Sequence, residues 1–452
     1  MEEATEVRPI YSGPRGTAIK ILNRVERTDA YLDKLLDVEL KSKEISDIDK
    51  SLLAEIVHGV TRWQGRLDWV LNGFTHGGFT KSEVNVKNSL RVALYQILFL
   101  TQVPHYASVN EAVEFIKRLR GDKSANLVNA VLRNIIRSMD GIHYPKVDED
   151  PVQYLAVYYS HPQWLVKRWY NRFGREETEK FLISNNEIPG LSLRINKLKI
   201  ASAEFLSLLD KKNISYQGSS FIDYFVKVKS LAGISQMDLF QQGYFSIQDE
   251  SAALPVILLS PQPGERVIDM CAAPGGKTTF IGEQMKNQGE IIAIDKYESK
   301  LNMIRTSCER LGINNVQLMA ADSSELEILP ADKVIVDAPC SGLGTLRKKP
   351  DIKWKREPED IARMVVQQSK LLEQASRLVK PGGVLVYSTC TTEPEENIFQ
   401  IKSFLQQHPE FSLDQASRIV NKSLLTEDEC IETFPFRHHL DGSFAARMIK
   451  SS

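Results

Sequence analysis

Long apolar segments are missing from this chain of 452 residues, and no run approaches the roughly 18–20 apolar residues of a membrane-spanning helix. Residues 1–6 are largely acidic and lack the apolar core of a secretory signal. Cysteine is scarce: the chain has five, with no Cys-x-x-Cys spacing and no cluster with histidine, which argues against disulfides and zinc sites. These absences predict a cytoplasmic protein with reduced thiols, no membrane association and no bound metal.

A surplus of either charge is missing as well, because the net charge is −1 at pH 7. No global field therefore attracts nucleic acid, and any such binding has to use local basic patches. The composition, 42% hydrophobic and 25% charged, is typical of a globular protein. The length exceeds that of one ordinary core, so two or three domains are expected.

Residues 1–145 are expected to form an all-α bundle. Residues 90–100 are nearly all apolar and predict a buried helix. The sequence from Ser108 to Glu111 has the form of a capping box and predicts a helix that begins there, and Gly121 should end it. The basic residues of this region fit a solvated surface and contact with nucleic acid equally well.

The rest of the chain changes pattern twice. Residues 140–151, with acids, two prolines and a glycine, resemble a linker, and residues 146–237 mix helix and strand patterns, which predicts a small α+β (RRM-like) module. Residues 238–452 alternate strands with helices, which predicts a Rossmann-like α/β domain with a parallel sheet covered on both faces. The strand candidates are 266–270, 290–294, 316–320, 333–336 and 384–387, with 443–449 as a further edge strand.

A glycine-rich loop, residues 271–278, follows the first of these strands. Gly276, Lys277 and Thr278 match the second half of a P-loop, but the first glycine of that motif falls on Cys271. A P-loop NTPase is therefore the weaker alternative. In the Rossmann-type alternative, small residues let the backbone approach a ligand at the start of a helix.

Two aspartates extend this pattern. Asp295 ends the second strand, 19 residues after Gly276, close to the spacing of about 20 expected for a ribose-binding acid. Asp322 ends the third strand, where an adenine-binding carboxylate is expected. Each could merely cap a helix, but two acids in this order favour a nucleoside-like cofactor. S-adenosylmethionine fits, because it needs no phosphate cradle.

Two cysteines, Cys340 and Cys390, each follow an apolar strand where it should give way to a loop. A buried cysteine is more often inert packing, but these two have small polar or turn-forming neighbours. A thiolate that adds to carbon 6 of a pyrimidine makes carbon 5 nucleophilic enough to accept a methyl group. Asp337, three residues before Cys340, could hydrogen-bond the base. This chemistry leaves open which cysteine is the nucleophile.

A basic run with one tryptophan, Trp354, follows Cys340. Such a run is usually a solvated surface, but its place after a proposed catalytic strand favours phosphate contact with an incoming polynucleotide. Trp354 could stack on a base or anchor the loop. The residues predicted to bind this polynucleotide are Arg347, Lys348, Lys349, Lys353, Lys355 and Arg356.

The motifs at 271–278, 337–342 and 387–391 together resemble those of RNA cytosine-5 methyltransferases, and those at 108–113 and 128–133 resemble a NusB-like RNA-binding domain. The resemblance implies methyl transfer from S-adenosylmethionine to a cytosine of bacterial small-subunit (16S) rRNA. It implies RNA, free or in an early assembly particle, as the partner. We also expect a monomer.

The resemblance also implies residue roles. Cys390 corresponds to the nucleophile, whereas Cys340 assists product release. DNA cytosine-5 enzymes use the cysteine at the Cys340 position instead. We expect Cys390 to be activated as a thiolate. The implied cofactor-binding residues are Cys271, Ala272, Ala273, Pro274, Gly275, Gly276, Lys277, Asp295, Asp322 and Asp337. A non-catalytic RNA-binding or assembly factor with the same fold is the alternative, against which the intact cysteine pair argues.

Overall fold

The computed structural model describes residues 10–42, 46–229 and 234–452. The acidic residues 1–6, expected to be no secretory signal, and residues 230–233 of the predicted small module lie outside this range. The chain folds into two compact units. One is Met1–Asn186 with Lys349–Lys355, and the other is Glu187–Lys348 with Arg356–Ser452. The three-part division at residues 145 and 237 stays a prediction.

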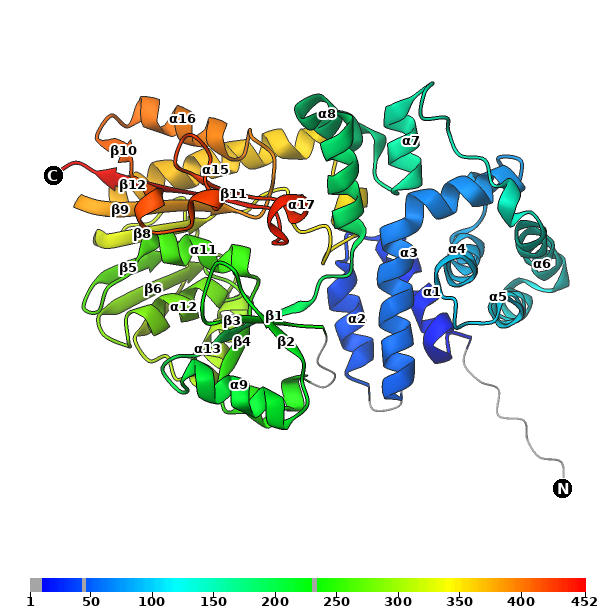
Figure 1. Ribbon diagram of the computed structural model, residues 1–452, viewed down its shortest axis with the longest axis horizontal. Coiled ribbons are helices and arrows are strands. Elements are labelled where there is room, and N and C mark those ends of the chain that lie inside the picture. The colour runs from blue at the N-terminus through cyan, green and yellow to red at the C-terminus, as the bar shows by residue number, and fades with distance from the viewer. Residues whose placement is uncertain (1–9, 43–45, 230–233) are drawn as a thin grey trace. The chain divides into compact units, whose positions relative to one another are not determined.

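The first unit is helical, as the sequence predicts (Figure 1). The apolar stretch 90–100 falls in α4 up to Phe99, with Leu100 as its C-cap, and this helix is buried on nearly every side between residues 85 and 97. The core contains Leu53, Ile56, Leu94 and Ile116, all with no more than a trace of exposure. The helices are α1 (Gly13–Arg27), α2 (Leu32–Leu40), α3 (Asp47–Phe74), α4 (Val84–Phe99), α5 (His105–Arg120), α6 (Asp122–Arg137), α7 (Pro151–Tyr158) and α8 (Gln163–Asn186).

The predicted helix start at Ser108 is wrong. Helix α5 begins at His105, because Pro104 takes the extended conformation of an N-cap and its carbonyl accepts the amide of Ala107. Ser108 therefore lies inside the helix and is buried, where it cannot cap. Gly121 separates α5 from α6 as predicted, at a φ of +79° that favours glycine.

A short piece of the basic run belongs to this helical unit. In residues 349–355, Lys353 Nζ donates to the carbonyl of Arg62 at 2.9 Å, and Trp354 Nε1 donates to that of Thr61 at 2.7 Å. Both acceptors lie in α3. A Cβ on Gly65 would lie only 2.8 Å from the Trp354 ring, so the absence of a side chain there lets the ring approach α3. Trp354 thus anchors this segment.

The second unit begins with a small antiparallel sheet, which confirms the predicted α+β module. The strand order is β2-β3-β1-β4, and Phe205 and Leu209 of a covering helix pack on its buried side chains. The elements are β1 (Leu191–Ile195), α9 (Ser202–Lys211), β2 (Tyr216–Gly218), β3 (Phe225–Val228), α10 (Asp238–Gln241) and β4 (Phe245–Ile247).

The larger sheet has the order β10-β12-β9-β8-β5-β6-β7, with β11 also paired to β12. The five strands from β9 to β7 are parallel, and β12 and β10 are antiparallel. The strand predicted at 443–449 is present, but it is not an edge strand, because β12 pairs with β9 and also with β10 and β11. The bounds are β5 (Arg266–Asp269), β6 (Glu290–Asp295), β7 (Val316–Ala320), β8 (Ala331–Asp337), β9 (Val379–Thr389), β10 (Phe411–Leu413), β11 (Ile431–Thr433) and β12 (Ser443–Lys450).

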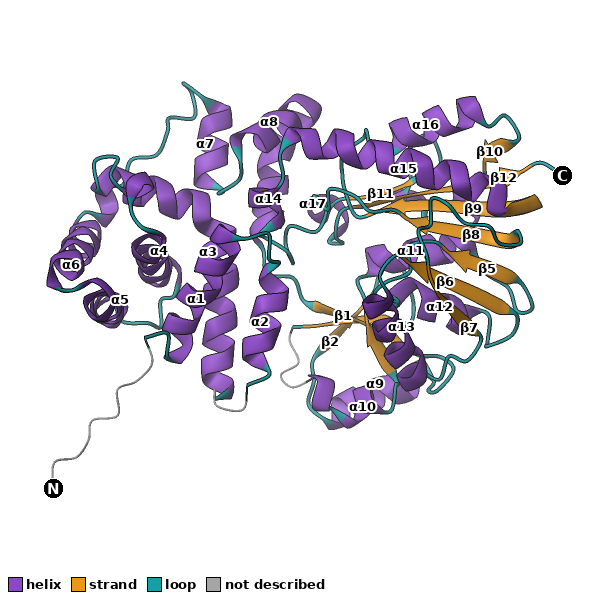
Figure 2. Ribbon diagram, turned by 180° about the vertical axis from the view of Figure 1, so that it is seen from behind, coloured by secondary structure: helices purple, strands orange, loops and turns teal. Residues whose placement is uncertain are grey.

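Helices cover both faces of this sheet (Figure 2). Alternate strand residues point to opposite faces: Ile335 packs with the core under α11 and α12, whereas Val334 and Val336 pack with the core under α15 and α16. The parallel strands change direction of winding between β5 and β8, and ligands bind at the carboxyl ends of strands beside such a point. The covering helices are α11 (Glu250–Leu259), α12 (Gly276–Gln284), α13 (Glu298–Leu311), α15 (Pro358–Leu378) and α16 (Ile398–Gln407).

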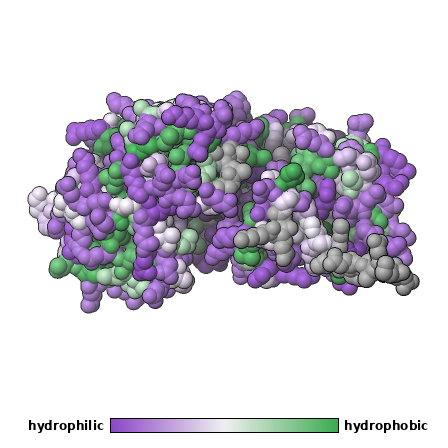
Figure 3. Space-filling view, turned by 90° about the horizontal axis from the view of Figure 1, so that it is seen from below, coloured by the Kyte–Doolittle hydropathy of each residue, from purple (hydrophilic) through white to green (hydrophobic). Residues whose placement is uncertain are grey.

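Hydrophilic residues predominate on the molecular face in Figure 3. Within the described residues, no helix combines the length and the apolar character needed to cross a bilayer.

Candidate active site

The predicted cofactor loop joins β5 to α12. Gly275 has a φ of +102°, and a side chain there would press on Ile304, which explains glycine at this position. Asp269 ends β5 and is fully buried, and its Oδ2 accepts a 2.7 Å hydrogen bond from Thr278 Oγ1. Among the described residues, the other oxygen, Oδ1, has no hydrogen-bond partner of good geometry. Burial raises the pKa of Asp269 to about 7.

Asp295 and Asp322 lie at the carboxyl ends of the neighbouring strands β6 and β7. Asp295 accepts the backbone N–H of Tyr297 at 3.0 Å. Asp322 accepts that of Ser324 at 3.1 Å, and this bond, with the Ser324 hydroxyl and Lys296, lowers its pKa to about 2. Neither is the N-cap of α13, whose N-cap is Tyr297. The two acids are therefore placed along one sheet edge, as predicted.

Lys277, at the start of α12, is paired with Asp337 at the end of β8. Its Nζ lies 2.6 Å from Asp337 Oδ2, and Asp337 Oδ1 accepts a 2.9 Å hydrogen bond from Ser388 of β9. Burial acts to lower the pKa of Lys277, but Asp337 outweighs it and the pKa is raised. The lysine and Thr278 thus have partners within the protein, which differs from a P-loop that offers both groups to phosphate and magnesium.

The two predicted catalytic cysteines converge. Cys340 Sγ lies 3.2 Å from Cys390 Sγ and accepts the backbone N–H of Cys390 at 3.3 Å. Cys390 is exposed and Cys340 is half-buried. The hydrogen bond with Cys390, burial and the nearby charge of Glu396 raise the pKa of Cys340 well above its usual range. Cys340 is therefore a thiol at neutral pH, suited to donate rather than to attack.

The other three cysteines behave as packing residues. Burial raises the pKa of Cys271 well above its ordinary value, that of Cys308 to about 11 and that of Cys430 to about 12. Such thiols are unreactive at neutral pH. Cys271 still lies in the cofactor loop, where the sequence places it.

Sequence reasoning missed a buried polar cluster that joins the loops carrying the two cysteines. Glu396, fully buried, accepts the backbone N–H of Ser341 at 2.8 Å and its hydroxyl through a short hydrogen bond. Gln368 Nε2 donates to the same carboxylate at 2.9 Å. The signal in the sequence was a group of acids in residues 393–396, directly after Cys390. Asp269 was missed too, although it stands at a strand end.

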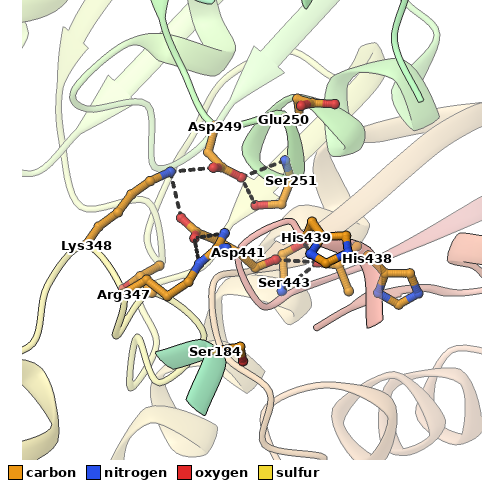
Figure 4. A network of polar contacts seen from close by, with 12 residues as sticks. Ser184, Asp249, Glu250, Ser251, Arg347, Lys348, His438, His439, Asp441 and Ser443 are labelled. Atoms are coloured by element: carbon orange, nitrogen blue, oxygen red, sulfur yellow. Dashed lines mark hydrogen bonds and ion pairs between the residues drawn. The ribbon is translucent and has the colours of Figure 1, made fainter. Parts of the chain in front are cut away.

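The basic run does not form one patch. Arg347 is buried and binds Asp441 Oδ1 through Nη2 at 2.8 Å, and Lys348 joins Asp249 to Asp441 (Figure 4). In this network Lys348, together with hydrogen bonds from Ser251, outweighs burial and lowers the pKa of Asp249 to about 2. These two cations stabilise the chain after Cys340.

The other four basic residues are divided between exposure and internal contacts. Lys353 is buried in the helical unit, and Lys355 Nζ donates to the carbonyl of Ala30. Arg356 Nε donates to the carbonyl of Ser341 at 2.9 Å, whereas Lys349 is exposed. RNA contact by these residues stays a prediction, and Lys349 is the one best placed for it.

Three family models match successive parts of the chain. They are the NusB family at residues 12–137, the RsmF/B-like ferredoxin-like domain at 161–234 and the 16S rRNA methyltransferase RsmB/F family at 256–449. The probable ribosomal RNA small subunit methyltransferase B of Bacillus subtilis (strain 168) is 38% identical over 96% of this chain and 98% of its own length. The chain belongs to the ribosomal RNA small subunit methyltransferase B family. The Escherichia coli O1:K1 / APEC member is 33% identical over 96% and 98%.

Solved structures agree with this membership. The crystal structure of PH0851 has a TM-score of 0.82 and 28% identity, and covers 98% of this chain and 99% of that one. A methyltransferase homolog from Pyrococcus horikoshii has a TM-score of 0.60 and 29% identity, and covers 67% and 99%. The ribosomal RNA small subunit methyltransferase B family fixes the coarse activity, methyl transfer to small-subunit rRNA with S-adenosylmethionine as donor. Membership of this family confirms the predicted fold classes and contradicts the P-loop NTPase alternative.

Proposed function

We propose that this protein methylates carbon 5 of a specific cytosine in 16S rRNA through a covalent bond between Cys390 and the base. The main support is the pair of sulfur atoms 3.2 Å apart at the ends of β8 and β9. Asp337 ends β8, which lies between β9 and β5 in the sheet, and its partners are Lys277 of the cofactor loop and Ser388 of β9. A methyltransferase acting on an oxygen or an exocyclic nitrogen needs no such pair of thiols.

The loop at the end of β5 fits S-adenosylmethionine. Oδ1 of buried Asp269 can accept a hydrogen bond from an ammonium group, and Gly275 lets the loop pass close to Ile304, where a Cβ would be crowded. Asp295 and Asp322 would hold the ribose and adenine, with residues 271–277 as the loop around them. When bound, the cofactor supplies an electrophilic methyl group. The Asp337 carboxylate, at the end of the neighbouring strand β8, is held in place by hydrogen bonds from Lys277 and Ser388.

The chain's own residues carry the rest of the chemistry. The Cys390 thiolate adds to carbon 6 of the cytosine, and the electron pair of the 5,6 double bond moves to carbon 5. A hydrogen bond from the base to Asp337 eases this addition. After methylation, the carbon-5 proton passes to solvent water, and its electron pair re-forms the double bond. The carbon–sulfur bond then breaks and Cys390 leaves as a thiolate, beside the S–H group of Cys340.

RNA selection requires more than this site, because a pocket for one base cannot distinguish one cytosine in a folded rRNA. We propose that the NusB-like helices and the ferredoxin-like module position the RNA, and that the target base is unstacked to reach Cys390. We also propose that the protein acts as a monomer in the cytoplasm, without a metal. Light scattering of the purified protein that gave a dimer mass would contradict the first of these.

The decisive experiment compares wild type, Cys390→Ala and Cys340→Ala with S-adenosylmethionine and unmodified 16S rRNA. The rRNA is mapped for 5-methylcytosine, and each reaction is run on a denaturing gel. We expect no methylation with Cys390→Ala, and an RNA-linked protein band that accumulates with Cys340→Ala. Reversed behaviour would exchange the two roles. Methylation with Cys390→Ala and Cys340→Ala alike would rule out covalent catalysis, and none with wild type would favour the binding-factor alternative.

A further inference from the structure

The loops that carry the two cysteines are tied together by one buried side chain. Glu396 follows Cys390 by six residues and is fully buried. One of its oxygens accepts the amide of Ser341, the residue after Cys340, and the other accepts the Ser341 hydroxyl. Because that hydroxyl donates to Glu396, its oxygen can accept from Thr391, the residue after Cys390, at 2.7 Å.

The residue before Cys340 is held by the same cluster. Gln368 of α15, fully buried, donates through Nε2 to Glu396 and also to the carbonyl of Pro339, both at 2.9 Å. Residues on both sides of Cys340, and one beside Cys390, therefore depend on a single carboxylate. All of these partners donate hydrogen bonds, which favours the ionised carboxylate, whereas burial acts against them and raises the pKa of Glu396 above its ordinary value.

We propose that Glu396 is the positioning residue that holds Cys340 against Cys390 for release of the methylated RNA. This inference rests on the proposed function. In the release step the carbon–sulfur bond breaks, its electron pair returns to Cys390 Sγ, and the S–H of Cys340 donates a hydrogen bond to that sulfur. The carbon-5 proton goes to solvent water, so Cys340 keeps its own proton and the step is balanced.

The charge of Glu396 serves the same purpose as its hydrogen bonds. Together with Cys390 and burial, it raises the pKa of Cys340, which keeps this thiol protonated. The other ionisable groups around the cluster are Asp337, Tyr387, Glu393 and Arg356. Tyr387 donates to the Glu396 carbonyl at 2.7 Å, and Arg356 donates to the Ser341 carbonyl.

Two substitutions separate geometry from charge. Glu396→Gln can keep every contact: its oxygen accepts from Ser341 and Gln368, and its amide donates to the Ser341 hydroxyl, which turns toward Thr391. Glu396→Ala removes both contacts and charge. The matched control is Glu395→Gln, on the same loop and half-buried. Cofactor binding and circular dichroism establish that each variant is folded.

The first readout is the pH profile of iodoacetamide alkylation at Cys340, followed by mass spectrometry of its peptide in the otherwise native protein. The pH at which alkylation of Cys340 is half-maximal should be lower in Glu396→Gln than in wild type, and it should be unchanged in Glu395→Gln. The second readout is the covalent RNA–protein band. Glu396→Ala should slow its release by about tenfold to a hundredfold, which corresponds to a lost hydrogen bond to a charged group. Glu396→Gln keeps the contacts and should therefore release the covalent band at most of the wild-type rate at neutral pH.

Equal alkylation midpoints in Glu396→Gln and Glu395→Gln would overturn the role of the charge. Release by folded Glu396→Ala at the wild-type rate would overturn the positioning role. Failure of the proposed function would give a different result, because the wild-type protein would then methylate no cytosine. The alkylation profiles would still show whether the charge of Glu396 raises the pKa of Cys340.

Discussion

Cys340 Sγ and Cys390 Sγ lie 3.2 Å apart, although 50 residues separate them in the chain. The sheet brings them together. Asp337 and Ser388 are register partners on the parallel strands β8 and β9, so the cysteines that follow them leave the sheet at the same edge. Two thiols at hydrogen-bond distance also constitute a site for two-electron oxidation.

Mild oxidation should join the two cysteines. One sulfur reduces a peroxide to water through a sulfenic acid, and the other displaces a second water to form the disulfide. We expect methyl transfer to be lost and then recovered with dithiothreitol, and peptide mapping should identify a Cys340–Cys390 link. Cys308→Ser, a control at a buried cysteine, should oxidise at the wild-type rate. Inactivation without the linked peptide would contradict this prediction.

Asp269→Asn should stabilise the cofactor-free protein at alkaline pH and weaken cofactor binding. Burial raises the pKa of this carboxyl from 3.8 to about 7, so the folded state loses stability as the pH rises through that window. The loss is at most roughly 4 kcal/mol, at about 1.36 kcal/mol for each unit. Urea unfolding of wild type and variant at pH 5.5 and 8.5 measures it, with calorimetry for S-adenosylmethionine.

The control for that comparison is Asp322→Asn. The pKa of Asp322 is lowered from 3.8 to about 2, so its stabilising contribution is complete above 3.8 and is lost only as the pH falls toward 2. Its effect on unfolding should therefore be equal at pH 5.5 and 8.5. An Asp269→Asn effect that also did not change with pH would show that Asp269 is ionised at both values.

Lys348→Met should destabilise the second unit by about 3 kcal/mol at pH 7, the lower end for removing one partner of a buried ion pair. The substitution leaves Asp249 and Asp441 without their shared ammonium group (Figure 4). Lys348 keeps the pKa of Asp249 at about 2 against burial, so the difference from wild type should shrink as the pH falls below 3.8. Urea unfolding between pH 3 and 7 tests this. Lys349→Met, at the exposed neighbour, should change stability by less than about 0.5 kcal/mol.

Lys349→Gln should lower the salt dependence of RNA binding. Loss of one phosphate contact reduces the slope of log K against log salt by about 0.7–0.9. Filter binding of an rRNA fragment at several salt concentrations gives the slope. Lys353→Met should leave it unchanged, because Lys353 is buried and bonded to Arg62. Equal slopes for Lys349→Gln and wild type would exclude Lys349 from the phosphate contacts.

The strands and the cysteine pair could be predicted because they follow from local pattern and sheet geometry. Runs such as 333–336 and 384–387 are mainly apolar and rich in β-branched residues, and parallel strands end at one edge. The structure lengthens both, to Ala331–Asp337 and Val379–Thr389, because strand pairing continues beyond the apolar core. Sequence pattern alone does not reveal where pairing stops.

The environment of each charge could not be predicted, since it depends on partners distant in the chain. Lys353 finds the carbonyl of Arg62, 291 residues away, and Arg347 finds Asp441, 94 residues away. In the sequence, Lys353 and Arg347 look like exposed cations, because nothing near them in the chain indicates these partners. The same limit hid Glu396, whose position between the cysteine loops exists only after α15 and β9 have packed together.

The helical unit is built from two parts of the chain, because the segment Lys349–Lys355 belongs to it although the residues on both sides of this segment belong to the second unit. Residues 187–452 cut out as a separate protein would carry Trp354 and Lys353 with no Thr61 or Arg62 to receive them. A boundary drawn at Asn186 therefore divides the helical unit itself, and it leaves the surface of α3 around Thr61 and Arg62 without the segment that covers it.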